Sequence, residues 1–297
     1  MSRSTNTFST SVWLSAALAL ASIVSMNFGA SWAKILMRDV GANGAVWLRF
    51  IAAAIVLTTM SIIGRLNNRH HPPMQLTKWP WLKVANYSAA LLIMNWSIYH
   101  AFNKIPIGAG VTIELLGPLA LAVIASRRML DYLWIALALA GVVGLGVQPV
   151  TNLGGIAWSL VAGLCWALYI QAGSKLIGPR NIEVLAFTYW VGTLVLAPIA
   201  LPGLLTTHFT PKLWLAAGLV GFFSAALPYS IELVVMRRVP AQLFSILQAM
   251  GPAIAAILAW IVIGETLSSL AWLAIVAVIA ASVGATVSAS NQRQPSK

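Results

Sequence analysis

Residues 104–118 read KIPIGAGVTIELLGP, and residues 238–252 read RVPAQLFSILQAMGP. The two stretches align without a gap, and their shared marker positions all lie 134 positions apart: Pro106 with Pro240, Glu114 with Gln248, Gly117 with Gly251, and Pro118 with Pro252. The same spacing pairs Asp131 with Glu265, each at the start of the helix expected to follow. Five matches at one spacing indicate an internal repeat, with one copy in residues 1–149 and the other in residues 150–297.

The chain around these stretches is too apolar for a water-soluble protein. Of its 297 residues, 60% are hydrophobic and 8% are charged, against roughly 25% charged in an ordinary soluble domain. Its net charge of +12 comes from Lys and Arg placed singly or in pairs between apolar runs, so nucleic acid is not an expected partner. The single cysteine, Cys165, excludes an internal disulfide and a cysteine-based metal cluster.

Ten apolar runs have the length that a bilayer requires, which is about 20 residues for a hydrocarbon core of roughly 30 Å. They lie at about residues 12–33, 44–64, 82–103, 107–126, 132–148, 153–174, 184–203, 212–235, 241–263 and 268–289. Runs this long are helices, because barrel strands alternate over about ten residues. The sequence therefore predicts an all-α polytopic membrane protein with the lipid bilayer as its surroundings.

The repeat sets spans one to five against spans six to ten. Because five is odd, the two halves must enter the membrane from opposite sides, which makes them inverted five-helix repeats. Inverted repeats are common in transporters, and the substrate site then lies near the midplane where the halves meet.

The placement of Lys and Arg in the loops predicts the orientation. With the N-terminus inside, thirteen of the 18 fall on the cytoplasmic side and four on the outer side (Lys34, Arg38, Lys104 and Lys212), while Arg49 lies within the second span. Cytoplasmic loops carry the excess of positive residues, so both termini are expected in the cytoplasm. Arg49, about one turn into its span, is expected to snorkel toward the outer interface and to act architecturally.

The paired Gly-Pro steps, Gly117-Pro118 and Gly251-Pro252, predict helix breaks in spans four and nine. Proline cannot donate to the carbonyl four residues earlier, so the freed carbonyls are those of Glu114 and Gln248. Broken helices at matching midplane positions indicate a binding site, although proline kinks can also serve packing alone.

Glu114 is the most informative of these residues, because an ionisable group near the bilayer centre costs at least about 2.5 kcal/mol unless it is paired or hydrated. Three roles stay open for it: proton coupling, contact with a substrate ammonium group, and a neutral interhelical hydrogen bond. Glu232 in span eight is expected closer to the cytoplasmic surface, where it would pair, because Arg237 and Arg238 follow it.

Aromatic and polar residues at helical spacing supply the other candidates. Span three carries Tyr99 and His100, and span six carries Trp166 and Tyr169 on one stripe. A wall of aromatic and hydrogen-bonding groups suits an amino acid, whereas aromatic residues are also common at membrane interfaces. Together with Glu114 and Gln248, these four residues are the predicted substrate-binding residues.

Four segments carry a family resemblance: IPIGAGVTIELLGPLALA (105–122), SRRMLD (126–131), WLRF (47–50) and IGETLS (263–268). They resemble the ten-helix EamA-type family of the drug/metabolite transporter superfamily, and the first two are most similar to its threonine, homoserine and aromatic amino acid exporters. The resemblance implies an inner-membrane secondary transporter that exports neutral or aromatic amino acids, such as threonine, homoserine, methionine or phenylalanine, by alternating access.

Two alternatives are weighed against amino acid export. Related members of the superfamily carry drugs and other metabolites, so another small solute is the first alternative. An intramembrane enzyme is more remote, because the sequence has no H-E-x-x-H or G-x-S-x-G motif and its four histidines form no ligand pattern. We expect no metal, no cofactor and no ATP-binding loop. Ten helices can enclose a path within one chain, which allows a monomer.

Overall fold

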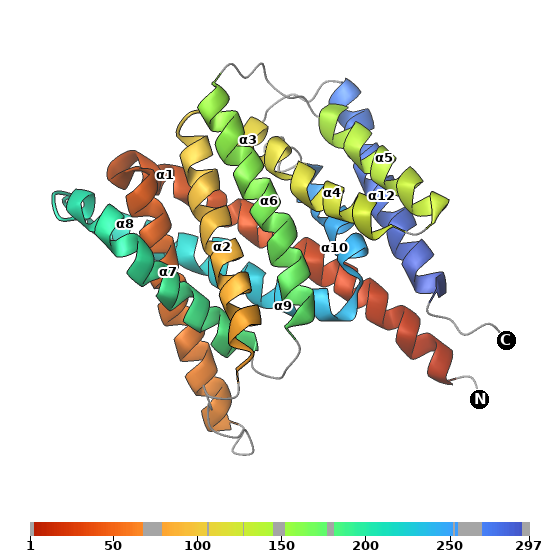
Figure 1. Ribbon diagram of the computed structural model, residues 1–297, viewed down its shortest axis with the longest axis horizontal. Helices are drawn as coiled ribbons and strands as arrows, with labels where there is room; N and C mark the ends of the chain where they lie inside the picture. Colours follow the sequence, from red (N-terminus) through yellow and green to blue (C-terminus); the bar gives the residue numbers. More distant parts are fainter. Residues whose placement is uncertain are drawn as a thin grey trace.

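The computed structural model describes residues 3–67, 79–105, 107–126, 128–144, 152–176, 181–251, 253–254 and 269–292. Within these ranges every regular element is helical (Figure 1). The helices are α1 (Arg3–Asn67), α2 (Trp81–Phe102), α3 (Ile107–Glu114), α4 (Leu116–Ala125), α5 (Met129–Gly144), α6 (Leu153–Lys175), α7 (Asn181–Leu204), α8 (Pro211–Gly221), the π-helical η2 (Phe222–Ala226), α9 (Leu227–Arg238), α10 (Ala241–Gln248) and α12 (Ser269–Gln292).

Helix α1 is two helices joined at a sharp bend. Gly41 has φ 67° and ψ 179°, a conformation that glycine reaches easily because it has no Cβ. The bend falls between the first two predicted spans, and the two arms of α1 lie at an angle to each other (Figure 1). The expected separation of residues 12–33 from residues 44–64 is therefore confirmed, without an intervening loop.

Among the described residues, five helical stretches are long and apolar enough to cross a membrane: Trp13–Ala30, Leu36–Gly64, Leu153–Lys175, Ile182–Leu204 and Pro211–Arg238. Shorter apolar helices occur at Gly110–Ile124, Met129–Gly141 and Trp272–Ala285. The chain is thus a multi-pass, all-helical membrane protein.

Large apolar side chains also cover the outside of the bundle. Ile124 is 81% exposed and Leu205 is 84% exposed, and many other Leu, Ile, Val and Trp side chains are exposed with them. Apolar patches of this extent are rare on soluble monomers. Such an apolar exterior is suited to contact with lipid.

Helices that lie far apart in the sequence pack against each other. Helix α2 packs on α6, α1 packs on α7 and α8, and α5 packs on α12. Helix α1 also contacts η2, α9, α10 and α12, so it passes through the middle of the bundle (Figure 1). Side chains of α1 therefore meet those of helices that lie far along the sequence.

Two helices end where the sequence predicts interruptions. Helix α3 ends at Glu114, and Leu115 forms a turn before α4 begins. Helix α10 ends at Gln248, and Ala249 forms the corresponding turn. In the first case the interruption lies one turn before Pro118, as the missing proline N–H requires. Pro252 lies outside the described residues, so its part in the second interruption stays a prediction.

Asp131 lies in the first turn of α5, which confirms it as a helix-start residue. A carboxylate at this position interacts favourably with the helix dipole. Its predicted counterpart, Glu265, lies outside the described residues.

Candidate functional site

Eight buried side chains from six helices meet in the interior, and we call them the central polar cluster. Their exposed fractions lie between 0% and 8%. The members are Arg49, Asn95, Tyr99, Glu114, Tyr169, Tyr229, Glu232 and Gln248. Ionisable groups inside a membrane protein are costly, and they typically mark a functional site.

The carboxylate of Glu232 accepts hydrogen bonds from two other helices. The Tyr169 hydroxyl donates to Oε2 at 3.1 Å, and the Gln248 Nε2 donates to Oε1 at 2.9 Å. These bonds join α9 to α6 and α10. Because a hydrogen bond to a charged group contributes about 1.5–3 kcal/mol, the two bonds hold Glu232 in one orientation.

The predicted surface pairing of Glu232 is wrong. The side chain is 1% exposed and has the two partners just described. Arg237, which follows it in α9, donates instead to the Leu176 carbonyl at 2.8 and 3.1 Å. The packing of α6 and α10 on α9 buries Glu232, and the sequence spacing to the arginines does not reveal this.

The prediction that Arg49 snorkels to the interface is also wrong, because the side chain is buried. Its guanidinium donates to the Ser224 carbonyl of η2. The guanidinium carbon lies 5.7 Å from the ring centre of Tyr99 and 5.8 Å from that of Tyr229. Both distances fall within the range of a cation–π interaction. The packing of α1 against α2, η2 and α9 thus encloses Arg49 beside two aromatic rings.

The π-helical turn η2 contacts both arms of α1, since Ser25 and Gly29 lie before the bend at Gly41 and Arg49 lies after it. Its Phe223 carbonyl accepts a hydrogen bond from Ser25 Oγ at 2.7 Å, and its Ser224 carbonyl accepts from Arg49. A Cβ at Gly29 would lie 2.6 Å from the Ser224 nitrogen, so the two backbones approach closely. π-Helical turns occur frequently at functional sites, and this one orients a buried cation.

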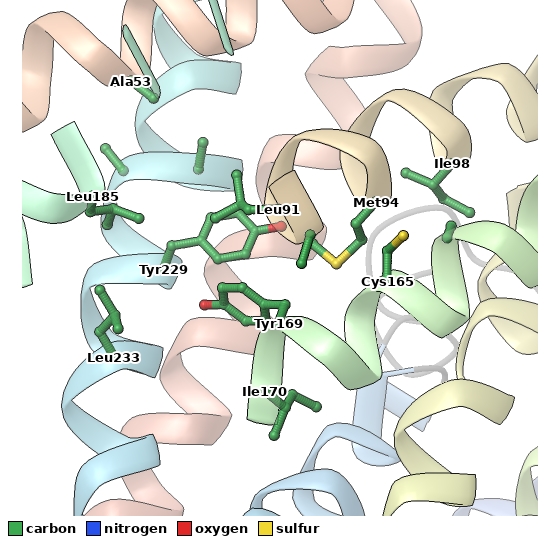
Figure 2. Close-up of a cluster of buried hydrophobic side chains, with 14 of the residues drawn as sticks. Ala53, Leu91, Met94, Ile98, Cys165, Tyr169, Ile170, Leu185, Tyr229 and Leu233 are labelled. Carbon is green, nitrogen blue, oxygen red and sulfur yellow. The ribbon is translucent and has the colours of Figure 1, made fainter. Parts of the chain in front are cut away.

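Tyr229 connects the Arg49 side of the cluster to the Glu232 side. Its hydroxyl and the Asn95 amide lie within hydrogen-bonding distance, at 3.3 Å from Nδ2 and 3.4 Å from Oδ1. Its ring meets the Tyr169 ring edge-on, with ring centres 5.5 Å apart. Figure 2 shows the two rings together, with their hydroxyl oxygens pointing in opposite directions. Side-chain contacts therefore connect seven of the eight residues, all except Glu114.

Glu114 enters the cluster at the helix interruption. Its side chain is 8% exposed and lies near enough to Arg49 for an electrostatic interaction when the carboxyl group is ionised. Its backbone carbonyl lies 2.5 Å from the position that a Cβ would occupy at Gly163 of α6. A Cβ at Gly117 would likewise meet the backbone of Gly163. Residue 163 must therefore be glycine for α6 to approach the interrupted helix this closely.

Of the six predicted substrate-binding residues, four belong to the central polar cluster: Tyr99, Glu114, Tyr169 and Gln248. Trp166 is half-buried and packs against the apolar core. Whether these residues bind a substrate stays a prediction.

His100 belongs to a second group of side chains. Its Nε2 lies 2.9 Å from Asn43 Oδ1, which also accepts from Trp96 Nε1 at 3.1 Å. The rings of His100, Trp96 and Trp158 contact one another, with centres 4.7, 5.5 and 5.1 Å apart. These contacts connect the start of the second arm of α1, at Asn43, to α2 and through Trp158 to α6.

Sequence reasoning did not select Arg49, Asn95, Tyr229 or Glu232 for the site. For the two charged residues a signal was present, because the cost of an intramembrane charge applies to them as it does to Glu114. For Asn95 and Tyr229 the sequence offers only polar side chains on apolar helices, and their pairing depends on how α2 and α9 are rotated.

Comparisons with known proteins agree over nearly the whole chain. The EamA-like transporter family matches residues 153–287. The chain is 34% identical to the threonine/homoserine exporter RhtA of Escherichia coli (strain K12) over 291 residues, which cover 95% of this chain and 94% of that protein. RhtA of Salmonella typhimurium (strain LT2) is also 34% identical, with 95% of each chain covered.

Two further matches are more distant. The uncharacterized inner membrane transporter YedA of E. coli (strain K12) is 25% identical over 275 residues, or 86% of this chain and 83% of that protein. One crystal structure superposes with a TM-score of 0.76 over 94% of this chain and 99% of the other, at 16% sequence identity. That likeness extends to the fold alone.

Proposed function

The chain belongs to the EamA-like transporter family, and we propose from this membership that it exports neutral or aromatic amino acids across the bacterial inner membrane. Relatives 34% identical over 95% of the chain are named threonine/homoserine exporters. Threonine and homoserine are therefore the first substrates to test, with methionine and phenylalanine after them.

The central polar cluster is the observation that carries this proposal. It combines a cation, two acids and two amides, all buried, inside a protein whose exterior is apolar. Charged groups in such a place usually lie on a substrate or ion path. An amino acid carries one positive and one negative group, and this cluster holds side chains of both signs.

We further propose ten spans in two inverted halves, residues 1–149 and 150–297, with the site between them. The positions of α3 and α10 support the repeat, because both helices have eight residues and their ends lie 134 positions apart. Both are also followed by a one-residue turn. Glu114 and Gln248, the last residues of these helices, thus take equivalent places in the two halves.

Alternating access follows from this arrangement. The cluster residues are nearly inaccessible to solvent, so the halves must rock apart for a solute to reach them from either side. In this scheme both termini are cytoplasmic, the transporter needs no cofactor, and a monomer suffices.

The test is counterflow in proteoliposomes. Vesicles are preloaded with one unlabelled amino acid, and uptake of the labelled form is followed against protein-free vesicles. We expect exchange of threonine or homoserine. Exchange of another metabolite or a drug, with no amino acid moved, would select the alternative transporter function. Chemical alteration of the solute without movement would indicate an intramembrane enzyme.

A pair of acid variants tests whether the cluster carries the activity. We expect Glu232→Gln to reduce exchange at least about tenfold, because it replaces a charged acceptor worth about 1.5–3 kcal/mol. Glu183→Gln is the matched control, since Glu183 lies in the first turn of α7, outside the cluster. Equal exchange by the two variants would contradict the site.

A further inference from the structure

Arg49 is held in place but is not fully paired. Its side chain is 5% exposed, and the Nε–H group has no hydrogen-bond partner among the described residues. The guanidinium donates to the Ser224 carbonyl and lies beside the rings of Tyr99 and Tyr229. These contacts fix its position and leave one edge of the guanidinium with an unused donor.

The acids nearby do not use this donor. The two oxygens of Glu232 already accept from Tyr169 and Gln248. Glu114 lies near enough to Arg49 for an electrostatic interaction when it is ionised, but the Nε–H is not bonded to it or to any other group in the described ranges. An unused donor on a buried cation is unfavourable, so a further anion would gain a charged hydrogen bond at this position.

Gln248 presents the complementary group. Its Nε2 donates to Glu232, while its Oε1 has no hydrogen-bond partner within the described part of the chain. The side chain is 3% exposed. The cluster thus holds an unused donor on a cation and an unused acceptor beside a carboxylate.

We propose that Arg49 binds the α-carboxylate of the transported amino acid, while Gln248 Oε1, beside the Glu232 carboxylate, receives the α-ammonium group. This inference rests on the proposed function and assigns the substrate class as α-amino acids with both groups free. A guanidinium matches a carboxylate in a planar, two-bond geometry that an ammonium does not reproduce. The rings of Tyr99 and Tyr229, whose centres lie 5.7 and 5.8 Å from the guanidinium carbon, contribute to holding the guanidinium in place.

Wild-type protein gives the first test, which requires no variant to fold. Counterflow of the labelled substrate is competed with the unlabelled amino acid, with its amino alcohol, which lacks the carboxylate, and with its 2-hydroxy acid, which lacks the ammonium group. We expect both analogues to compete roughly 10- to 100-fold more weakly, as the loss of a charged hydrogen bond implies. An amino alcohol that competes as well as the amino acid overturns the inference.

Arg49→Lys then assigns the effect to the residue. We expect it to weaken competition by the amino acid roughly 10-fold or more while changing competition by the amino alcohol little, so that the ratio between the two falls. Arg237→Lys is the matched control, because Arg237 binds a backbone carbonyl outside the cluster, and it should keep the wild-type ratio. An Arg49→Lys protein that is monodisperse and folded and keeps the wild-type ratio also overturns the inference.

The two proposals fail differently in these assays. If no amino acid exchanges, the proposed function fails and the inference falls with it. If amino acids exchange and the amino alcohol competes equally well, the function stands and only the role of Arg49 is wrong.

Discussion

Replacing Gly163 with Ala tests the close approach of α6 to the interrupted helix. A Cβ at this position would lie 2.5 Å from the Glu114 carbonyl oxygen and 3.2 Å from its carbon. The shortest ordinary carbon–oxygen contacts are about 3.3 Å, so α6 and Glu114 would have to separate by about 0.8 Å. Both atoms at the contact belong to the backbone, which cannot rotate away as a side chain would.

The expected cost is that of overpacking, about 1–3 kcal/mol in the free energy of unfolding. Alanine also stabilises a helix by about 1 kcal/mol relative to glycine, and the comparison must subtract this stabilisation. Gly218→Ala does so, because Gly218 lies in helix α8 and a Cβ there would meet nothing within 4 Å. The difference between the two variants therefore isolates the packing cost.

Thermal unfolding in detergent measures the difference. We expect Gly163→Ala to unfold roughly 2–12 °C below Gly218→Ala, taking about 2–4 °C for each kcal/mol. Counterflow should also decrease in Gly163→Ala, because the shift displaces Glu114 in the central polar cluster. If the two variants unfold at the same temperature, the close backbone contact at Gly163 is refuted.

Three further predictions address the cluster and the bend in α1. Tyr169→Phe should lower the free energy of unfolding by about 1.5–3 kcal/mol, because it removes a donor to a buried carboxylate. The control Tyr189→Phe should lower it much less, because the Tyr189 hydroxyl has no hydrogen-bond partner among the described residues. Equal unfolding temperatures for the two variants would contradict the assigned bond. Glu114→Gln separates the three roles weighed for Glu114. Exchange that continues without pH dependence indicates proton coupling, since an amide exchanges no proton, and loss of exchange at every pH indicates substrate contact. A wild-type rate and pH profile would rule out both. Gly41→Ala should destabilise the protein by about 1–2 kcal/mol, because φ 67° disfavours a residue with a Cβ, whereas Gly64→Ala in the same helix, with open space around it, should not; circular dichroism melts would measure both.

Much of the fold follows from local sequence properties. The length of an apolar run limits where a helix can cross a membrane, and the ends of α2, α6 and α7 lie within a few residues of the predicted spans. The interruption after Glu114 was predictable because the missing N–H of Pro118 acts within one turn. Four of the six predicted site residues lie in the cluster, because apolar helices carry few polar groups and these groups are therefore easy to select from the sequence.

What the sequence determined by itself is therefore the helical, membrane-spanning class and the positions along each helix where polar groups and breaks occur. Only the tertiary structure decided which of these groups meet. Arg49 and Ser224 are 175 positions apart, and Tyr169 and Glu232 are 63 apart. In a membrane the lipid-facing side of a helix is as apolar as the packed side, so the sequence carries little periodic signal for how each helix is rotated. Rotation and crossing of α1, α2, α3, α6, α9 and α10 bring a buried cation, two acids and two amides to one place. These depend on packing between distant segments.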